Sequence, residues 1–268
     1  LIVVAVATAG FVTSLFIKKI PAANPELPIR LNPVKPTYEI LKLTRSVRPV
    51  FVSVLAISWF WFLGASFLSL LPNFSKDVLG GGETVVTLGL ATFCVGIGSG
   101  SMLCERLSRH HLEIGLVPLG SIGISVFAID LAFSGWRFAP PAGSGLLTVA
   151  EYLRQPGGLH VLFDLFMIAV FSGFYTVPLM TFIQQRSAGA VRSRVIAGNN
   201  ILNALLMVAS SLMLMGLLAA EVSIPGIFLM LALLNAAVAA CIFTAMPEFV
   251  RRFIAWLKRT FKIRNSEV

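Results

Sequence analysis

Long apolar stretches dominate this sequence and limit what it can fold into. A helix that crosses the hydrocarbon core of a bilayer needs about 20 mostly apolar residues. Seven stretches reach or approach that length: 1–17, 50–71, 84–103, 114–133, 160–183, 196–218 and 224–245. With 57% hydrophobic and 12% charged residues, the chain has too much apolar surface for a soluble domain of this length to bury. The sequence therefore predicts an all-α, polytopic membrane protein with about seven transmembrane helices, because backbone polar groups in lipid must be satisfied within each span.

The positions of Lys and Arg predict how these helices are threaded. Eighteen of the 21 basic residues fall in alternate connections and in the C-terminal tail, whereas three fall in the other connections. Basic residues concentrate in cytoplasmic loops, so we expect the first stretch to exit into the cytoplasm and the chain to end there. This distribution accounts for the net charge of +9 without a nucleic-acid partner.

The same pattern divides the chain into four segments. Leu1 lies within an apolar run, so residues 1–17 are expected to be a truncated transmembrane helix. Residues 18–49 form a Pro-rich, basic cytoplasmic loop, 50–245 a six-helix block, and 246–268 a basic cytoplasmic tail. As a helix, the tail gathers its charges on one side and most of its aromatic residues on the other, which is typical of helices that lie among lipid headgroups. A solvated linker helix is the alternative.

One span, a long basic loop and six further spans resemble half of the Major Facilitator superfamily plan, in which a cytoplasmic loop joins two six-helix halves. The first stretch would be the end of helix 6, and the others helices 7–12. Residues 101–110 also resemble the superfamily's cytoplasmic signature between helices 8 and 9. Glu105, Arg106 and Arg109 stand at its charged positions, while serines replace its glycines. An acid beside arginines can latch a cytoplasmic seam through charge-assisted hydrogen bonds; ordinary positive-inside charge is the alternative.

Further stretches resemble the lysophospholipid transporter branch of that superfamily: 104–108 with 113–120, 171–178 and 192–200. The last contains Arg192 and Arg194, which we group with the signature residues as gating or motif residues. The resemblance implies that lysophospholipids, notably lysophosphatidylethanolamine, are moved inward across the bacterial inner membrane by alternating access. Some members are fused to a glycerophospholipid acyltransferase and an acyl–acyl-carrier-protein ligase, and residues 246–256 look like the bridge into such a domain. The implied partners are the bilayer, the lysophospholipid, an N-terminal transporter half and a fused or associated acyltransferase.

Two acids lie inside the expected spans, where a charge is costly and indicates function by default. Asp130 and Asp164 each lie toward the non-cytoplasmic end of their stretch. His160 precedes Asp164 by one helical turn, so both can face the same side. We interpret the acids as headgroup-amine contacts or a proton-sensitive gate. The alternative is acids at the outer interface, paired with Arg137 or Arg154.

Amides form a second group of expected substrate-binding residues. Asn199, Asn200 and Asn203 come at the cytoplasmic start of one stretch. That stretch corresponds to helix 11 of the superfamily, which borders the central cavity. Buried amides can bind phosphate or glycerol oxygens, or they can hold helices together. Holding helices together is the expected role of Asn235, near the middle of the last stretch.

Four consecutive aromatic residues, 59–62, lie in the second stretch. They can line a path for a lipid tail, because aromatic rings offer large apolar surfaces. Packing against the surrounding lipid is the alternative.

The sequence contains no constellation typical of an enzyme or a metal centre. Cys94, Cys104 and Cys241 are far apart and have no neighbouring ligand cluster, which argues against a disulfide framework or a metal site. We expect no cofactor, no metal and no catalytic activity in this segment. Two other functions stay open: Major Facilitator transport of another substrate, such as a drug or sugar, and a membrane anchor for a fused acyltransferase and ligase.

Overall fold

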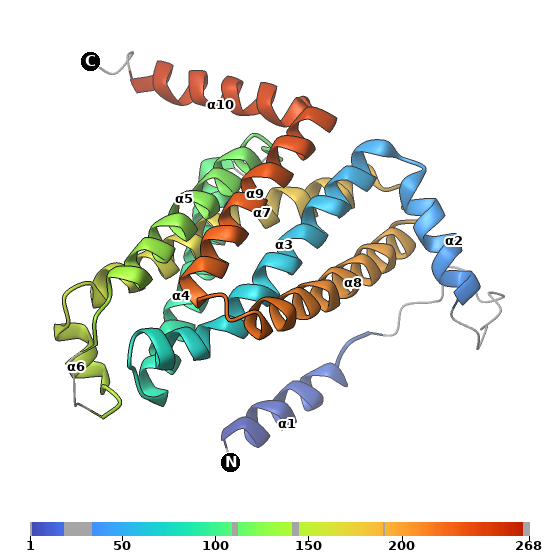
Figure 1. Cartoon of the computed structure of the whole chain (residues 1–268). Coiled ribbons are helices and arrows are strands. Elements are labelled where there is room, and N and C mark those ends of the chain that lie inside the picture. The colour runs from blue at the N-terminus through green and yellow to red at the C-terminus, as the bar shows by residue number, and fades with distance from the viewer. Residues whose placement is uncertain (1, 19–33, 109–111, 141–144, 190, 265–268) are drawn as a thin grey trace. The chain divides into compact units, whose positions relative to one another are not determined.

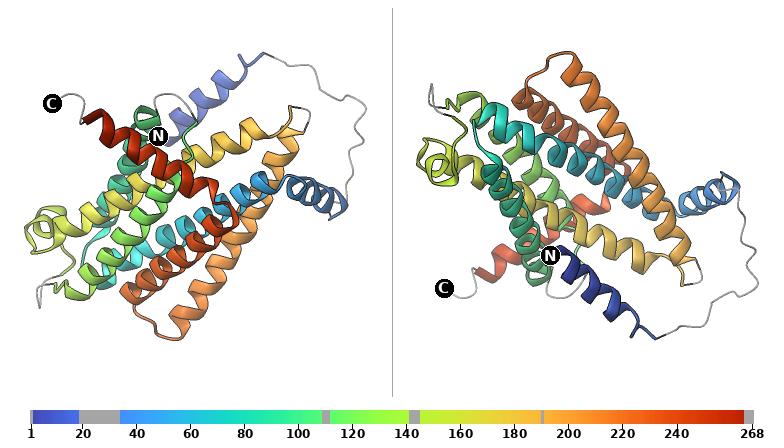
Figure 2. Two further views of the ribbon diagram at one scale, coloured as in Figure 1. Left: turned by 90° about the horizontal axis from the view of Figure 1, so that it is seen from above. Right: turned by 90° about the horizontal axis from the view of Figure 1, so that it is seen from below.

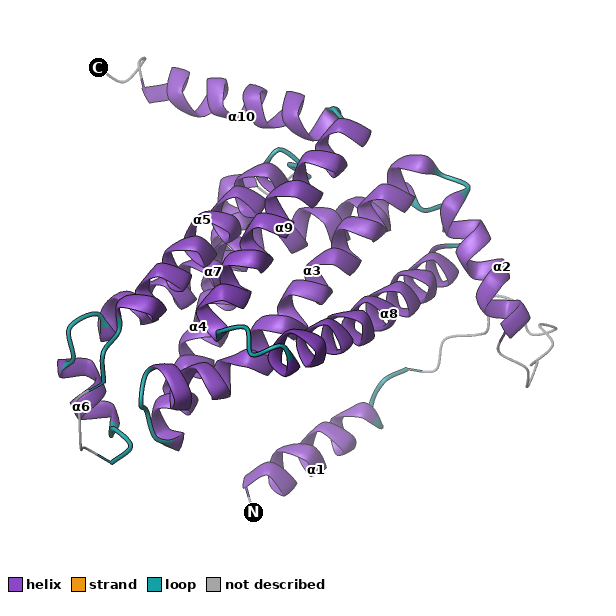
Figure 3. Ribbon diagram, viewed as in Figure 1, coloured by secondary structure: helices purple, strands orange, loops and turns teal. Residues whose placement is uncertain are grey.

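Helices make up most of the residues that the computed structural model describes, which are 2–18, 34–108, 112–140, 145–189 and 191–264 (Figure 1). Six helices have the length and hydropathy of membrane spans. They are α3 (Arg48–Asn73) with the π-helical turn η1 (Phe74–Val78), α4 (Glu83–Ser108), α5 (Leu116–Arg137), α7 (Gly158–Arg186), α8 (Arg192–Ala219) and α9 (Ile224–Ala245). No strand occurs in these ranges (Figure 3). The prediction of an all-α polytopic membrane protein is confirmed.

The first expected span forms a shorter helix than the other six. α1 (Ile2–Ser14) has 13 residues and at 1.5 Å per residue extends about 20 Å, less than the hydrocarbon core of about 30 Å. Among the described residues, six helices rather than seven therefore reach spanning length. Residues Leu1–Pro36 form one compact unit and Thr37–Val268 another. Most of the expected Pro-rich loop, residues 19–33, lies outside the described residues, and its end forms α2 (Val34–Arg45).

The six spans form an up-and-down bundle with α7 at its centre (Figure 1, Figure 2). α7 packs against α3, α4 and α5, while α8 packs against α3 and α9 packs mainly against α5. α4 and α8 therefore flank the bundle. They are its least buried spans, with 28% and 17% of their apolar windows buried, against 61% for α5 and α7.

The connections that carry most of the Lys and Arg residues lie at one end of the bundle, here called the basic end. The turns from α2 to α3, from α4 to α5 and from α7 to α8 lie at this end, as does α10 (Glu248–Arg264) (Figure 1). The opposite end holds η1, α6 (Val149–Arg154) and the turn from α8 to α9 (Figure 1). The alternation of Lys and Arg along the sequence thus corresponds to the two ends of one bundle.

Glycines let α4 approach α7 closely. A Cβ atom on Gly96 would come within 2.6 Å of the Ala169 Cβ, and Gly100 lies directly against the backbone of Val170. Gly173 faces Gly100 in return, with 2.6 Å between its Cβ position and the Gly100 carbonyl carbon. Such contact is typical of membrane helices, whose association depends on van der Waals packing more than on hydrophobic burial.

The basic tail forms α10, which lies across the basic end (Figure 2). Trp256 packs against a small apolar cluster of Cys104, Leu116, Val170 and Phe174, and Gly115 lies against the backbone at Arg252. Arg259 pairs with Glu113 at 2.8 Å. The aromatic side thus meets protein at Trp256, while the outward side mixes exposed apolar and basic residues: Val250, Arg251, Ile254 and Lys258.

Candidate functional site

Two buried amides of α8 meet α3 toward the basic end. Asn199 and Asn203 lie one helical turn apart, and both are buried. The surrounding groups orient the Asn203 amide so that its oxygen accepts from Trp61 Nε1 (3.2 Å) and Asn199 Nδ2 (3.0 Å). In this orientation Asn203 Nδ2 donates to Ser58 Oγ (2.9 Å) and to the Asn199 carbonyl (3.0 Å). Ser58, Trp61, Asn199 and Asn203 together are called the amide cluster.

One acceptor of the amide cluster is open. Asn199 Oδ1 is buried and has no hydrogen-bond partner among the residues that the structure describes. Leaving such a buried acceptor unpaired costs about 1–3 kcal/mol. A hydroxyl or ammonium group of a bound ligand would satisfy it.

Trp61 joins the amide cluster to an apolar pocket of 210 Å³ between α3, α4, α5 and α7. One hydroxyl, that of Ser172, accompanies an otherwise apolar lining: Phe60, Trp61, Leu63, Gly64, Phe67, Leu68, Phe93, Ile97, Ile124 and Ile168. The same indole ring therefore lines the pocket and donates its N–H to Asn203. Of the four aromatic residues expected to line a path for a lipid tail, Phe60 and Trp61 border this pocket.

A shallow groove of 490 Å³ continues along α3 and α8. Its lining combines apolar side chains with two hydroxyls: Ala65, Leu68, Ser69, Met207, Val208, Ser211 and Leu212. Leu68 borders both this groove and the apolar pocket. The face shared by α3 and α8, called the α3–α8 face, thus passes from amides near the basic end to the largely apolar groove further along both helices. That order suits an amphipathic molecule.

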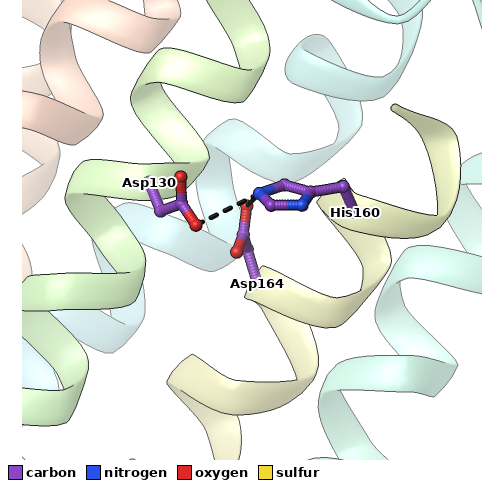
Figure 4. A group of neighbouring side chains, drawn as sticks. All are labelled: Asp130, His160 and Asp164. Carbon is purple, nitrogen blue, oxygen red and sulfur yellow. Dashed lines mark hydrogen bonds and ion pairs between the residues drawn. The ribbon is translucent and has the colours of Figure 1, made fainter. Parts of the chain in front are cut away.

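A second polar cluster lies toward the opposite end, between α5 and α7 (Figure 4). His160 Nε2 lies 3.1 Å from Asp130 Oδ2 and 3.6 Å from Asp164 Oδ2. Ser134 Oγ donates to Asp164 Oδ2 at 3.2 Å. Asp164 is fully buried, whereas Asp130 and His160 are about half exposed. Asp130, His160 and Asp164 are called the acid–histidine cluster, and the expected shared face of His160 and Asp164 is confirmed.

A pocket of 390 Å³ opens beside the acid–histidine cluster. Its lining contains two members of the cluster and the side chain of a neighbouring arginine: Asp130, Ser134, Arg137, Phe138, Pro156, Gly157 and His160. Within the described residues, neither acid forms an ion pair with Arg137 or Arg154, the partners considered from sequence; both acids face His160 instead.

The turn before α7 sets the position of His160. In a capping box at the start of α6, the Glu151 carboxylate accepts from the Thr148 N–H at 2.8 Å, and this bond holds the pKa of Glu151 below its ordinary value. Tyr152 donates its hydroxyl hydrogen to the first carbonyl of α7 at 3.0 Å, and burial raises the pKa of Tyr152. Gly157, at φ 90°, takes a left-handed conformation that favours glycine. α7 then begins at Gly158, two residues before His160.

The residues expected to bind substrate do not form one site. Asn199 and Asn203 belong to the amide cluster near the basic end, while Asp130 and Asp164 lie toward the other end. Asn200 is exposed on α8, and its Oδ1 accepts from Asn199 Nδ2 at 3.5 Å.

The expected gating and motif residues lie at the basic end. Glu105 and Arg106 are exposed in the last turn of α4, and Arg109 lies outside the described residues. Arg192 and Arg194 are exposed at the start of α8, where Arg192 Nη2 donates to a backbone carbonyl just after α7 at 3.4 Å. A pocket of 230 Å³ borders Glu105. The latch between acid and arginines stays a prediction.

Asn235 holds three helices together, as expected. Its Nδ2 donates to the Ser121 carbonyl (3.0 Å) and to Ser125 Oγ (2.9 Å) on α5. Its Oδ1 accepts from Trp59 Nε1 (3.0 Å) on α3. Both ends of this buried amide are therefore satisfied by protein, and α9 is joined to α5 and α3.

The sequence analysis missed the residues that complete both clusters, namely Ser58, the indole N–H of Trp61, and Ser134. A partial signal existed, because Ser58 and Trp61 are three residues apart and Asn199 and Asn203 four apart, so each pair lies on one helix face. Those spacings do not indicate which faces of the two helices pack against each other.

No family model, curated protein or solved structure matches the chain.

Proposed function

We propose that this chain forms one half of a Major Facilitator-type transporter that moves a lysophospholipid, such as lysophosphatidylethanolamine, inward across the bacterial inner membrane. The basic end and α10 face the cytoplasm, and alternating access opens the α3–α8 face to each side in turn. The observation that carries the proposal is the double role of Trp61, which lines the apolar pocket and donates to Asn203.

The chemistry of the substrate agrees with this arrangement. A lysophospholipid has one acyl chain, a free glycerol hydroxyl and a polar headgroup. The apolar pocket takes the chain, and the open acceptor on Asn199 takes the hydroxyl. A phospholipid with two acyl chains has no such hydroxyl. A site built to bond a hydroxyl rejects the analogue that lacks it, because its own polar group is left unpaired.

The flanks of the bundle support the idea of a half-transporter. α4 and α8 are the least buried spans. Their outward side chains are large and apolar: Val95, Met102, Leu205, Val208, Leu212 and Met215. In a bilayer such a face meets lipid or other helices, and a second six-helix half would cover part of it.

The test is uptake of labelled lysophosphatidylethanolamine by spheroplasts that express the full-length protein. Trp61→Phe keeps an apolar ring in the pocket but removes the donor to Asn203. One lost hydrogen bond of about 1.4 kcal/mol predicts a roughly tenfold lower kcat/KM. Trp136→Phe, which changes an exposed indole of α5, is the matched control and should leave uptake unchanged.

Three results would separate the proposals. Uptake no greater than in the vector control would exclude translocation and favour a membrane anchor for a fused acyltransferase and ligase. Uptake of a sugar or drug without lysophospholipid would indicate a different Major Facilitator substrate. Residues 1–268 expressed alone should give no uptake, because they supply one wall of the cavity.

A further inference from the structure

The acid–histidine cluster brings three metal-binding groups to one point, although the sequence predicts no metal site. One ligand atom from each of Asp130, His160 and Asp164 lies within 4.8 Å of the other two. Asp130 comes from α5, and His160 and Asp164 come from successive turns of α7 (Figure 4). The three groups therefore converge from two helices.

The hydrogen-bond donors around the cluster do not satisfy all the oxygens of its two carboxyl groups. His160 Nε2 carries at most one hydrogen, yet Asp130 Oδ2 and Asp164 Oδ2 both lie within 3.6 Å of it. Asp164 is fully buried, and in the described part of the chain its Oδ1 has no hydrogen-bond partner. A buried carboxylate without a partner is costly. A cation held between the two acids would remove that cost.

The surroundings provide support and access. Ser134 Oγ donates to Asp164 Oδ2 at 3.2 Å, the kind of outer contact that orients a ligating carboxylate. The neighbouring pocket of 390 Å³ is bordered by Asp130 and His160, so an ion and its water ligands can enter. Arg137 also lines this pocket but pairs with neither acid among the described residues. It adds a positive charge that lowers the affinity for a cation without filling the cluster.

The ligand types select the class of ion. Mg²⁺ and Ca²⁺ prefer oxygen ligands throughout, whereas an imidazole nitrogen with carboxylates suits Zn²⁺, Mn²⁺ or Co²⁺. We infer that Asp130, His160 and Asp164 form a binding site for a divalent first-row transition-metal ion, with water completing its coordination. The bound ion links α5 to α7 at the end opposite the basic end.

The experiment is a titration of the full-length protein in lipid nanodiscs with Co²⁺, followed by visible absorption and by competition with Zn²⁺. His160→Ala and Asp164→Asn each remove a ligand and should weaken binding by at least about 100-fold. Ser134→Ala removes only the outer contact and should weaken it by about tenfold. Arg137→Gln should strengthen binding, because it removes a nearby positive charge.

Controls exclude other metal ligands of the chain. His110→Ala/His111→Ala removes the other two histidines, and Cys94→Ser/Cys241→Ser removes the exposed thiols; both variants should bind Co²⁺ as the unaltered protein does. Zn²⁺ should raise the Tm of the unaltered protein but not of His160→Ala, and a chelator should reverse the rise. Absence of binding by the unaltered protein, or equal binding by His160→Ala, would overturn the inference. Circular dichroism identifies any misfolded variant, and the graded effect of Ser134→Ala does not depend on removing a ligand.

Discussion

Arg259 Nη2 lies 2.8 Å from Glu113 Oε2, and this pair fastens α10 to the residues just before α5. The Glu113 side chain is nearly buried, whereas that of Arg259 is mostly exposed. The contact therefore lies at the edge of the docked surface, where Gly115 meets the α10 backbone. It holds the tail at a fixed place on the basic end.

We expect Arg259→Ala to loosen α10. The lost charge-assisted bond is worth about 1 kcal/mol after its exposure to solvent is considered, so amide hydrogen exchange in α10 should become about five times faster. Arg251→Ala, at an exposed position of the same helix, is the control and should leave exchange unchanged. Equal exchange in both variants would show that the apolar contacts alone dock the helix.

Adjacent amides on α8 should respond differently to removal. Asn199→Ala deletes a buried donor to Asn203 and should lower the free energy of unfolding by about 1–3 kcal/mol. It should also reduce lysophospholipid uptake, because the open acceptor is lost. Asn200→Ala changes an exposed side chain and should stay within about 0.5 kcal/mol. Thermal unfolding in nanodiscs and the spheroplast uptake assay measure the two effects, and identical behaviour of the variants would contradict the assignment.

The glycines of α4 provide a second matched pair. Gly100 lies against the Val170 backbone, so Gly100→Ala should force α4 from α7 and cost about 1–3 kcal/mol. Gly98 has open space at its Cβ position, and Gly98→Ala should stabilise the helix by up to about 1 kcal/mol. Thermal unfolding distinguishes them, and a tolerated alanine at Gly100 would contradict the close contact.

The proposed orientation predicts which single cysteines can be labelled from outside. Cysteines at Ala220 and at Ser193 would lie at the opposite end and the basic end, and both positions are exposed. In a background with Cys94 and Cys241 replaced by serine, a membrane-impermeant maleimide should label Ala220→Cys in intact spheroplasts. Ser193→Cys should react only after permeabilisation. The reverse result would invert the orientation and remove the basis for inward transport.

Span positions follow from the sequence because bilayer thickness sets the length of an apolar helix. The stretch 224–245 coincides with α9. α5 begins two residues later than expected and ends four later, while α7 begins two earlier and ends three later, because the polar residues that follow both apolar stretches remain helical. Apolar length carries no information about short surface helices, so α6 was not predicted. Its signal was local: Thr148 and Glu151 form a capping box.

Contacts within one helix were more predictable than contacts between helices. The one-turn spacing of His160 and Asp164 indicated their shared face, because helix geometry fixes it. The approach of Asp130 to His160 depends on how α5 and α7 are rotated against each other, as the bond from Trp61 to Asn203 depends on α3 and α8. Those rotations arise from packing along whole helices, such as the glycine contacts of α4, and no short sequence pattern specifies them.

α3 and α8 run in the same direction and are joined at two heights. Asn203 bonds Ser58, and Ser66 donates to Ser210 at 3.2 Å, eight residues further along α3 and seven along α8. These two hydrogen bonds keep the helices in register. Sliding by one turn, about 5.4 Å, would break both at once, and the membrane interior offers no water to replace them. The two helices therefore move together as one rigid pair, and any rocking of the protein has to be absorbed at other helix contacts, such as the close glycine contact between α4 and α7.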